Sequence, residues 1–212
     1  LSAIMTAMDV RPEAARVALH RLRKDKWIAS EKHGRISHHS LTPAGRAQSQ
    51  AASGRIYATP AELPDRWQMI VTDDADSDAH EKAGFTALMP RLYVGNASLP
   101  VPIGAAALPG QDAPDWMKRQ LEPASLAESY TQLSDALHRV ARDLCAAETL
   151  TPLQIATLRC LIVHNWRRLA LKHPALPRPL IRDDWAGLTA HQMVAELLSR
   201  YPRPDLPEIA TV

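Results

Sequence analysis

The alternation of hydrophobic and polar positions in residues 9–41 first predicts a helix. Pro12 fixes φ and lacks a backbone N–H, so it suits the first helical position, and no helix-breaking residue occurs from Glu13 to Lys26. At about 100° per residue, one narrow arc of this helix collects small and aliphatic side chains, while the opposite arc is polar and basic. The arc that we expect to face a core consists of Ala15, Ala18, Leu19 and Leu22.

A hairpin is predicted directly after this helix. Trp27 and Ile28 begin a strand-like run, His33-Gly34 stands where a two-residue turn would lie, and residues 35–41 form the returning strand. A helix followed by a hairpin with a basic tip is the order of a winged helix-turn-helix, in which the helix enters the major groove and the wing follows the backbone. The alternative is an ordinary solvated helix followed by a surface hairpin.

The segments on either side of this unit have helical patterns. Leu1, Ile4, Met5 and Met8 repeat at helical spacing and predict the end of an amphipathic helix. In the winged-helix interpretation the chain therefore opens inside the domain, and the first helix of that domain is absent. Thr42 as N-cap and Pro43 as first residue predict a polar connector helix that runs to about residue 53 and can end at Gly54.

Residues 64–110 have the pattern of a small α+β unit. A charged link, residues 73–78, follows the first apolar run, and only residues 80–84 remain for a crossover helix. That length is shorter than a βα unit requires, so either the helix is degenerate or residues are missing from the chain. The three apolar runs that predict strands are Trp67–Val71, Leu88–Val94 and Val101–Leu108.

The C-terminal half is predicted to be helical. Residues 110–115 form a hinge with proline and glycine, and prolines at 174, 177 and 179 enforce an extended connector. The proline-rich end is predicted to be frayed. Helical periodicity predicts three helices, which cover Ser125–Ala147, Pro152 to about Lys172 with Thr151 as the cap, and Leu188–Tyr201.

The charge of the 212 residues is divided unevenly. Residues 1–55 hold ten Lys/Arg and four Asp/Glu, a net +6, whereas the other 157 residues hold 15 against 19, a net −4. A basic surplus confined to one end indicates nucleic acid as a partner of that end. The two cysteines, Cys145 and Cys160, are too few for a disulfide framework, and we expect free, buried thiols in a reducing cytoplasm.

The predicted DNA-contacting residues divide between the helix and the hairpin tip. Arginine can bind guanine O6 and N7 bidentately, lysine and histidine can reach phosphates or base edges, and valine can touch a thymine methyl group. The helix offers Arg16, Val17, His20, Arg21 and Lys24, and the hairpin tip offers Lys32, His33 and Arg35 for phosphate contacts.

Metal, cofactor and enzyme functions find little support in the sequence. The nine histidines include no His-x-x-x-His pair, there is no Cys-x-x-Cys pair, and His38-His39 would face opposite sides of a strand, so we expect no metal and no cofactor. A nucleophile elbow, a phosphate-binding loop and a dinucleotide fingerprint are all absent, so we expect no enzyme. The rival function is a non-enzymatic interaction or structural protein whose winged helix contacts protein rather than DNA.

Several blocks of the sequence together carry a family resemblance. They are Arg16–Leu22 with Trp27-Ile28, Gly34-Arg35 and Leu41-Thr42, then Arg55–Tyr57 with Trp67, Gly84-Phe85 with Leu92–Val94, and finally His164–Arg168, Pro174–Pro177, Trp185 and Gly187. In these blocks the chain resembles the PaaX family, the transcriptional repressors of phenylacetic acid degradation.

The resemblance implies a three-part plan. Residues 1–57 would form the winged helix-turn-helix and connector, 58–112 a small ferredoxin-like α+β domain, and 113–212 a helical domain. It further implies a cytoplasmic homodimer that represses an aromatic-acid catabolic operon and leaves double-stranded operator DNA when an aryl-CoA thioester binds.

Trp166, Arg167 and Arg168 have two interpretations. They form either a core tryptophan with two surface arginines, paired to Asp183 or Asp184, or anchors for the phosphates of the effector.

Overall fold

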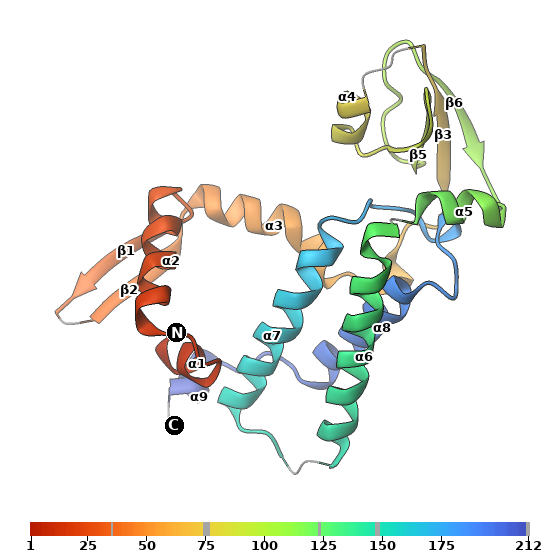
Figure 1. The fold of residues 1–212 in the computed structure, drawn as a ribbon. Helices are drawn as coiled ribbons and strands as arrows, with labels where there is room; N and C mark the ends of the chain where they lie inside the picture. Colours follow the sequence, from red (N-terminus) through yellow and green to blue (C-terminus); the bar gives the residue numbers. More distant parts are fainter. Residues whose placement is uncertain (35, 74–76, 123, 147–148, 211–212) are drawn as a thin grey trace.

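The computed structural model describes residues 1–34, 36–73, 77–122, 124–146 and 149–210, and it combines helices with two small sheets (Figure 1). In chain order the elements are α1 (Ser2–Ala7), α2 (Pro12–Lys24), β1 (Ile28–His33), β2 (Ile36–Leu41), α3 (Pro43–Tyr57), β3 (Trp67–Val71), α4 (Ser77–Lys82), β4 (Thr86–Met89), β5 (Leu92–Asn96), β6 (Ala106–Gly110), α5 (Asp115–Leu121), α6 (Ala124–Ala146), α7 (Pro152–Ala170), α8 (Ala186–Arg200) and α9 (Leu206–Ala210). Single 3-10 turns occur at Pro60–Glu62 and Arg178–Leu180.

The N-terminal part has the predicted helix and hairpin. Helix α2 begins at Pro12, and β1 pairs with β2 antiparallel. The last pair joins His33 to Ile36, so His33 belongs to strand β1 and not to the turn as predicted. Gly34 has a φ of +61°, a left-handed conformation that favours glycine. Arg35 lies outside the described residues, and the winged helix-turn-helix itself stays a prediction.

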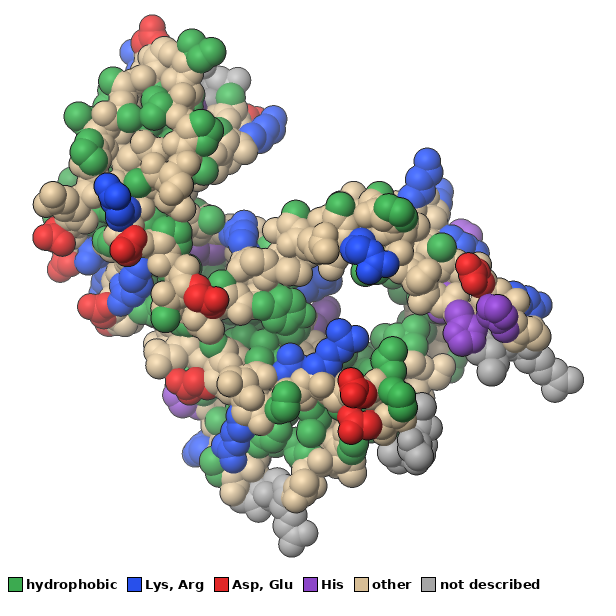
Figure 2. Space-filling view, turned by 180° about the vertical axis from the view of Figure 1, so that it is seen from behind, with side chains coloured by type: hydrophobic (Ala, Val, Ile, Leu, Met, Phe, Trp, Pro, Cys, Tyr) green, Lys and Arg blue, Asp and Glu red, His purple; other side chains and the backbone are tan. Residues whose placement is uncertain are grey.

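The apolar arc of α2 is more open than the sequence pattern predicts. None of the residues of α2 is buried, and Leu22 keeps 39% of its surface exposed. The reason is a shortage of partners, because β1 is the described element that packs most closely on α2. Seen from behind, an opening lies between this part of the chain and the helices beyond it (Figure 2).

Helix α2 and the hairpin of β1 and β2 form the helix–hairpin unit, and helix α3 links this unit to the rest of the chain (Figure 1). Thr42 caps it as predicted, since its hydroxyl oxygen accepts a hydrogen bond from the Gly45 N–H at 3.0 Å. The prediction that Gly54 ends the helix is wrong, because α3 continues to Tyr57. Burial of Ile56 in the helical core stabilises this last turn, which outweighs the low helix propensity of one glycine.

Two glycines of α3 provide a matched test of its packing. A Cβ at Gly45 would overlap the backbone carbonyl of Trp27, whereas a Cβ at Gly54 would meet nothing within 4 Å. We expect Gly45→Ala to lower the free energy of unfolding by about 1–3 kcal/mol and Gly54→Ala to raise it by about 0.5–1 kcal/mol. Urea titrations of both variants measure the two changes, and a Gly45→Ala protein as stable as the wild type would contradict this packing.

The middle sheet contains four antiparallel strands in the order β4-β5-β3-β6. Strand β3 has its predicted bounds, but the apolar run 88–94 is divided between two strands, because the chain reverses at Pro90-Arg91 and Arg91 adopts a φ of +65°. One short helix, α4, connects β3 to β4, and within the described residues none connects β5 to β6. The ferredoxin-like assignment therefore remains a prediction.

The buried hydrophobic residues form three clusters. Helices α6, α7 and α8 pack side by side around Tyr130, Ile162 and Val194, and Ile56 of α3 joins the same cluster (Figure 1). A second cluster lies between the sheet, α5 and the segment that follows α7. A third cluster, with Ile70 and Phe85, lies in the sheet unit beside α4.

Several C-terminal predictions need correction. The hinge at 110–115 is shorter than expected, because Gly110 pairs with Trp67 and α5 begins at Asp115. The proline connector contains a 3-10 turn and buries Leu176 and Leu180 against the sheet cluster. Residues 206–210, predicted to be frayed, form α9 on α7. Cys145 and Cys160 are free but exposed rather than buried.

Candidate functional site

The predicted DNA-contacting side chains lie on the exposed surface of α2 and of the hairpin tip. Val17 keeps 60% of its surface exposed, and every other residue of this set that the structure describes is exposed too. Basic and histidine side chains gather at this end of the molecule in the view from behind (Figure 2). The described members of the set are Arg16, Val17, His20, Arg21, Lys24, Lys32 and His33.

Two of these side chains have acidic neighbours on their own element. Arg16 Nη1 lies 3.6 Å from Glu13 Oε1, and His33 Nε2 lies 3.7 Å from Glu31 Oε2. Such exposed pairs contribute little to stability, so Arg16 can exchange its carboxylate partner for a phosphate. The assignment of these residues to DNA stays a prediction.

The hairpin also carries His38 and His39, which the sequence analysis did not assign to this surface. The rings of His33 and His38 meet edge to face with centroids 5.1 Å apart, and His39 Nδ1 lies 2.8 Å from the Ser30 hydroxyl. The signal that could have placed them was strand register, because residues paired across a hairpin share a face.

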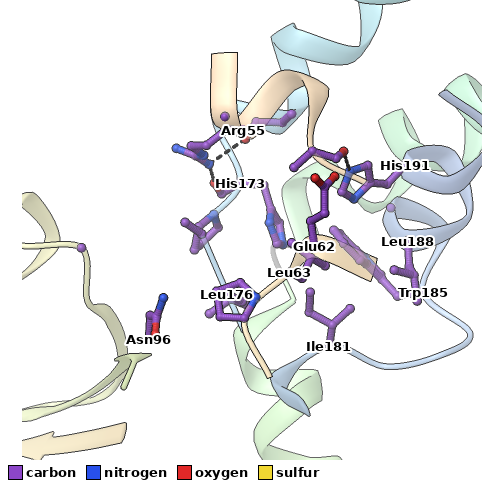
Figure 3. A pocket seen from close by; sticks show the side chains of 18 of the residues that line it. Arg55, Glu62, Leu63, Asn96, His173, Leu176, Ile181, Trp185, Leu188 and His191 are labelled. Carbon is purple, nitrogen blue, oxygen red and sulfur yellow. Dashed lines mark hydrogen bonds between the residues drawn. The ribbon is translucent and has the colours of Figure 1, made fainter. Parts of the chain in front are cut away.

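A cavity of about 330 Å³ lies where α3 ends (Figure 3). Its walls come from the last turn of α3, from the helices α6, α7 and α8, from the segment after α7, from Asn96 at the end of β5 and from Leu99 beyond it. Most of the wall is apolar, with Leu63, Leu176, Ile181 and Leu188 among its residues. This cavity therefore lies where the end of α3, the segment after it, the C-terminal helices and the end of β5 come together.

Aromatic rings form much of the cavity wall. His173 stacks on Trp185 with ring centroids 4.5 Å apart, and Tyr130 meets Trp185 edge-on at 4.8 Å. Trp166 stacks on His191 at 4.9 Å. Gly187 permits this arrangement, because a Cβ there would overlap the ring of Trp185.

Hydrogen bonds attach the end of α3 to the cavity wall. Arg55 Nη2 donates to the carbonyl of Ala170 at 2.7 Å and also to that of His173. Trp166 Nε1 donates to the carbonyl of Ile56 at 2.9 Å, and His191 Nε2 lies 2.6 Å from the carbonyl of Ala58 (Figure 3). Each residue from 55 to 58 except Tyr57 is thus bonded to the helical part of the chain.

The cavity wall is mostly uncharged at neutral pH. Burial lowers the pKa of His173 to about 4, so its imidazole is neutral. Burial also lowers the pKa of His191, against the effect of its hydrogen bond to Ala58, and raises the pKa of Tyr130. The formal charges in the wall are those of Arg55 and Glu62.

The three predicted effector residues do not share one cavity. Trp166 is buried and lines the cavity at the end of α3, whereas Arg167 and Arg168 are exposed. Arg167 lines a separate cavity of about 450 Å³ beside Arg203 and His164, and Arg168 lines a groove between α6 and α7. The suggested pairing to Asp183 or Asp184 is wrong, because these carboxylates pair with Arg178 and Arg182 instead.

Metal ligation and membrane insertion find no suitable group of residues in the described part of the chain. Nowhere in the described ranges do three histidine, cysteine or acidic side chains gather as metal ligands would. Among the described helices, none combines the length and apolar character that crossing a bilayer requires.

The chain is similar to one family model, to a curated protein and to a solved structure. Residues 122–205 match the family model described as "PaaX-like protein C-terminal domain". The chain is also 26% identical to the "Transcriptional repressor PaaX" of Escherichia coli (strain K12) in an alignment of 232 residues that covers 94% of this chain and 72% of that protein. A solved structure, "Uncharacterized protein Rv0674 from Mycobacterium tuberculosis", is 18% identical, with a TM-score of 0.46 over 93% of this chain and 86% of that one. The resemblance expected from the sequence is confirmed: residues 122–205 match the C-terminal domain of the PaaX family, and 94% of the chain aligns with a PaaX repressor.

Proposed function

We propose that this protein is a transcriptional repressor that binds double-stranded operator DNA through α2 and the hairpin tip. The observation that carries this proposal is the similarity to the PaaX repressor along 94% of the chain. The surface chemistry supports it, because the described basic residues of the segment that holds the net charge of +6 are exposed on consecutive elements. Arginine and lysine on such a surface can neutralise DNA phosphates.

The finer parts of the function follow from the family. We propose that two copies bind a two-fold operator of an aromatic-acid catabolic operon in the cytoplasm and that an aryl-CoA thioester releases them. Trp166, Arg167 and Arg168 remain our proposed effector contacts, each from its own side of α7. Arg167 has the more suitable neighbours for phosphate groups, since Arg203 and His164 line the same cavity and none of the three forms an ion pair with another described residue.

The experiment compares helix variants with a hairpin variant. We expect His20→Ala or Arg16→Ala to cost about 1–3 kcal/mol at particular base pairs and so to change sequence preference. Lys32→Ala should weaken binding to all sequences about equally and reduce the salt slope by about one unit. The measurement is fluorescence anisotropy with duplexes that the wild-type protein selects from a randomised library and with single-base variants of them.

Arg46→Ala is the control for these variants, since Arg46 is exposed on α3 outside the proposed contact set. It should leave the sequence preference unchanged. If Lys32→Ala changed the preference and the helix variants did not, the roles of helix and hairpin would be reversed. A wild-type protein that selects no duplex would favour the rival function of a protein-binding module.

A further inference from the structure

We propose that Thr42 is a positioning residue: it holds the base of the hairpin on the turn that follows α2, and so keeps the hairpin tip in place to contact DNA. The DNA half of this inference rests on the proposed function. The other half, a threonine that fixes the base of the hairpin, stands on hydrogen bonds of the helix–hairpin unit and can be measured without DNA.

The chain leaves α2 through a turn with a defined geometry. The N–H of Lys26 donates to the carbonyl of Arg23 at 3.1 Å. The N–H of Trp27 donates to the carbonyl of Leu22 at 2.8 Å, and these two bonds together are those of a Schellman motif. Lys26 occupies the left-handed position of the motif, with a φ of +58°, where glycine is the usual residue. This turn therefore sets the direction in which β1 departs from α2.

Thr42, at the other end of the hairpin, bonds to this turn. Its hydroxyl group donates to the carbonyl of Lys26 at 2.5 Å, and its backbone N–H donates to the carbonyl of Trp27 at 3.0 Å. The same hydroxyl oxygen accepts the N–H of Gly45 at 3.0 Å, which caps α3. Because Thr42 directly follows β2, one side chain joins the turn after α2, the end of the hairpin and the first turn of α3.

The hairpin tip depends on this base for its position. Glu31, Lys32 and His33 are exposed, and the closest contacts of the hairpin with other described elements are those of β1 with α2 and of β2 with α3. A strand of six residues is about 20 Å long, so a rotation of about 10° at the base moves the tip by about 3 Å. That distance is the length of a hydrogen bond, so a loosened base loses the phosphate contact proposed for Lys32.

Thr151 provides a matched control, because it begins α7 in the way that Thr42 begins α3. It also precedes a proline, and its hydroxyl oxygen accepts the N–H of Gln154 at 3.3 Å. It lies outside the helix–hairpin unit. Thr151→Val therefore removes the hydroxyl cap of a helix, whereas Thr42→Val removes such a cap together with the bond to Lys26.

The test combines two measurements on the full chain. Hydrogen exchange of the DNA-free protein, followed by mass spectrometry, reports how firmly the amides of residues 26–33 and 37–45 are held. Fluorescence anisotropy with the selected duplexes gives affinity and salt slope for the wild type, Thr42→Val, Lys32→Ala and the double variant. Thr42→Ser, which keeps the hydroxyl group, should restore the wild-type values in both measurements. Circular dichroism establishes that each variant is folded.

We expect Thr42→Val to accelerate exchange in both segments about tenfold or more, and Thr151→Val to leave it at the wild-type rate. Thr42→Val should also weaken DNA binding about eightfold at 0.1 M salt and reduce the salt slope by about one unit, the effect of one lost phosphate contact. Lys32→Ala should cause that loss in the wild type and almost none in Thr42→Val, because the tip is then no longer held at the DNA.

Three outcomes would overturn the inference. The first is equal exchange in Thr42→Val and the wild type, whether or not the protein binds DNA. The second is an equal effect of Lys32→Ala in both backgrounds, which would make Thr42 a helix cap and nothing more. The third is a loss of affinity in Thr151→Val as large as that in Thr42→Val, which would assign the effect to lower stability.

A further outcome concerns the proposed function alone. If the wild-type protein binds no duplex but Thr42→Val still accelerates exchange in the hairpin, Thr42 keeps its role at the base of the hairpin. That result overturns DNA binding as the function that the hairpin serves.

Discussion

Trp166→Ala is expected to lower the free energy of unfolding by about 3–5 kcal/mol. Trp166 is 4% exposed, stacks on His191 and lies beside Tyr130 in the helical core. The substitution would leave a cavity and would also strand the carbonyl of Ile56, which now accepts the indole N–H. Urea unfolding followed by circular dichroism measures the loss.

The neighbouring arginines are the matched controls for this prediction. Arg167→Ala and Arg168→Ala remove exposed side chains from the same turn of α7, so each should change the free energy of unfolding by no more than about 0.5 kcal/mol. Trp166→Phe should fall between, because it keeps a ring but not the hydrogen bond to Ile56. A Trp166→Ala protein that loses less than about 1 kcal/mol would contradict the structural role.

This structural role explains why a tryptophan stands among the exposed polar residues of the block 164–168. The side chain of Trp166 attaches α7 to the end of α3 through a hydrogen bond to Ile56, and its ring stacks on His191 of α8. Arg167 and Arg168 follow on the outward sides of the helix. Trp166 therefore joins the C-terminal helices to the connector that leads to the helix–hairpin unit, whatever ligand the protein binds.

The parts of the fold that were predicted correctly depend on local signals. A threonine before a proline predicts the start of a helix, and both Thr42 and Thr151 cap their helices through their hydroxyl groups. Strand β3 was predicted with its observed bounds, because the apolar run from Trp67 to Val71 is short and clearly bounded.

The errors arise where tertiary contacts or unusual backbone override local pattern. Gly54 is a plausible helix end, yet the burial of Ile56 two residues later keeps the helix intact. The turn at Pro90-Arg91 was hidden in an apolar run, because Arg91 is an uncommon residue at positive φ. The arc of α2 around Leu22 has the periodicity of a core face, but no described element covers it fully.

The two candidate sites differ in how far sequence could reveal them. The basic surface is contiguous in sequence, so its charge and exposure follow from residues 11–35 alone. The cavity at the end of α3 assembles residues as distant as Arg55, Asn96 and His191, and no spacing rule connects them. Trp166 and Trp185 belong to the blocks that resemble the family, but only the fold shows that they share a wall.

DNA binding by the full chain is expected to fall steeply with salt. Each phosphate neutralised by lysine or arginine releases counterions, and log K falls with log salt by about 0.9 per contact. Arg16, Arg21, Lys24 and Lys32 are exposed and offer four such contacts in each copy. Four contacts predict a loss of affinity of roughly 100-fold between 50 and 200 mM salt for one copy, and a larger loss if two copies bind together. Anisotropy titrations at four or more salt concentrations give the slope.

Charge reversal on the same surface separates electrostatic binding from other association. Arg21→Glu should reduce the slope and weaken binding at 50 mM salt far more than at 200 mM, because the added carboxylate repels phosphates most where screening is weak. Arg139→Glu is the matched control, since Arg139 is exposed on α6 on the opposite side of α7 from α1 and the hairpin (Figure 1) and lies outside the predicted DNA-contacting set. It makes the same change in net charge, so a long-range effect of net charge alone would appear in both variants.

Equal slopes for Arg21→Glu and the wild type would place the DNA elsewhere on the molecule. A protein whose association is indifferent to salt would instead fit a partner held by apolar contacts, to which the exposed Val17 and Leu22 of α2 are suited.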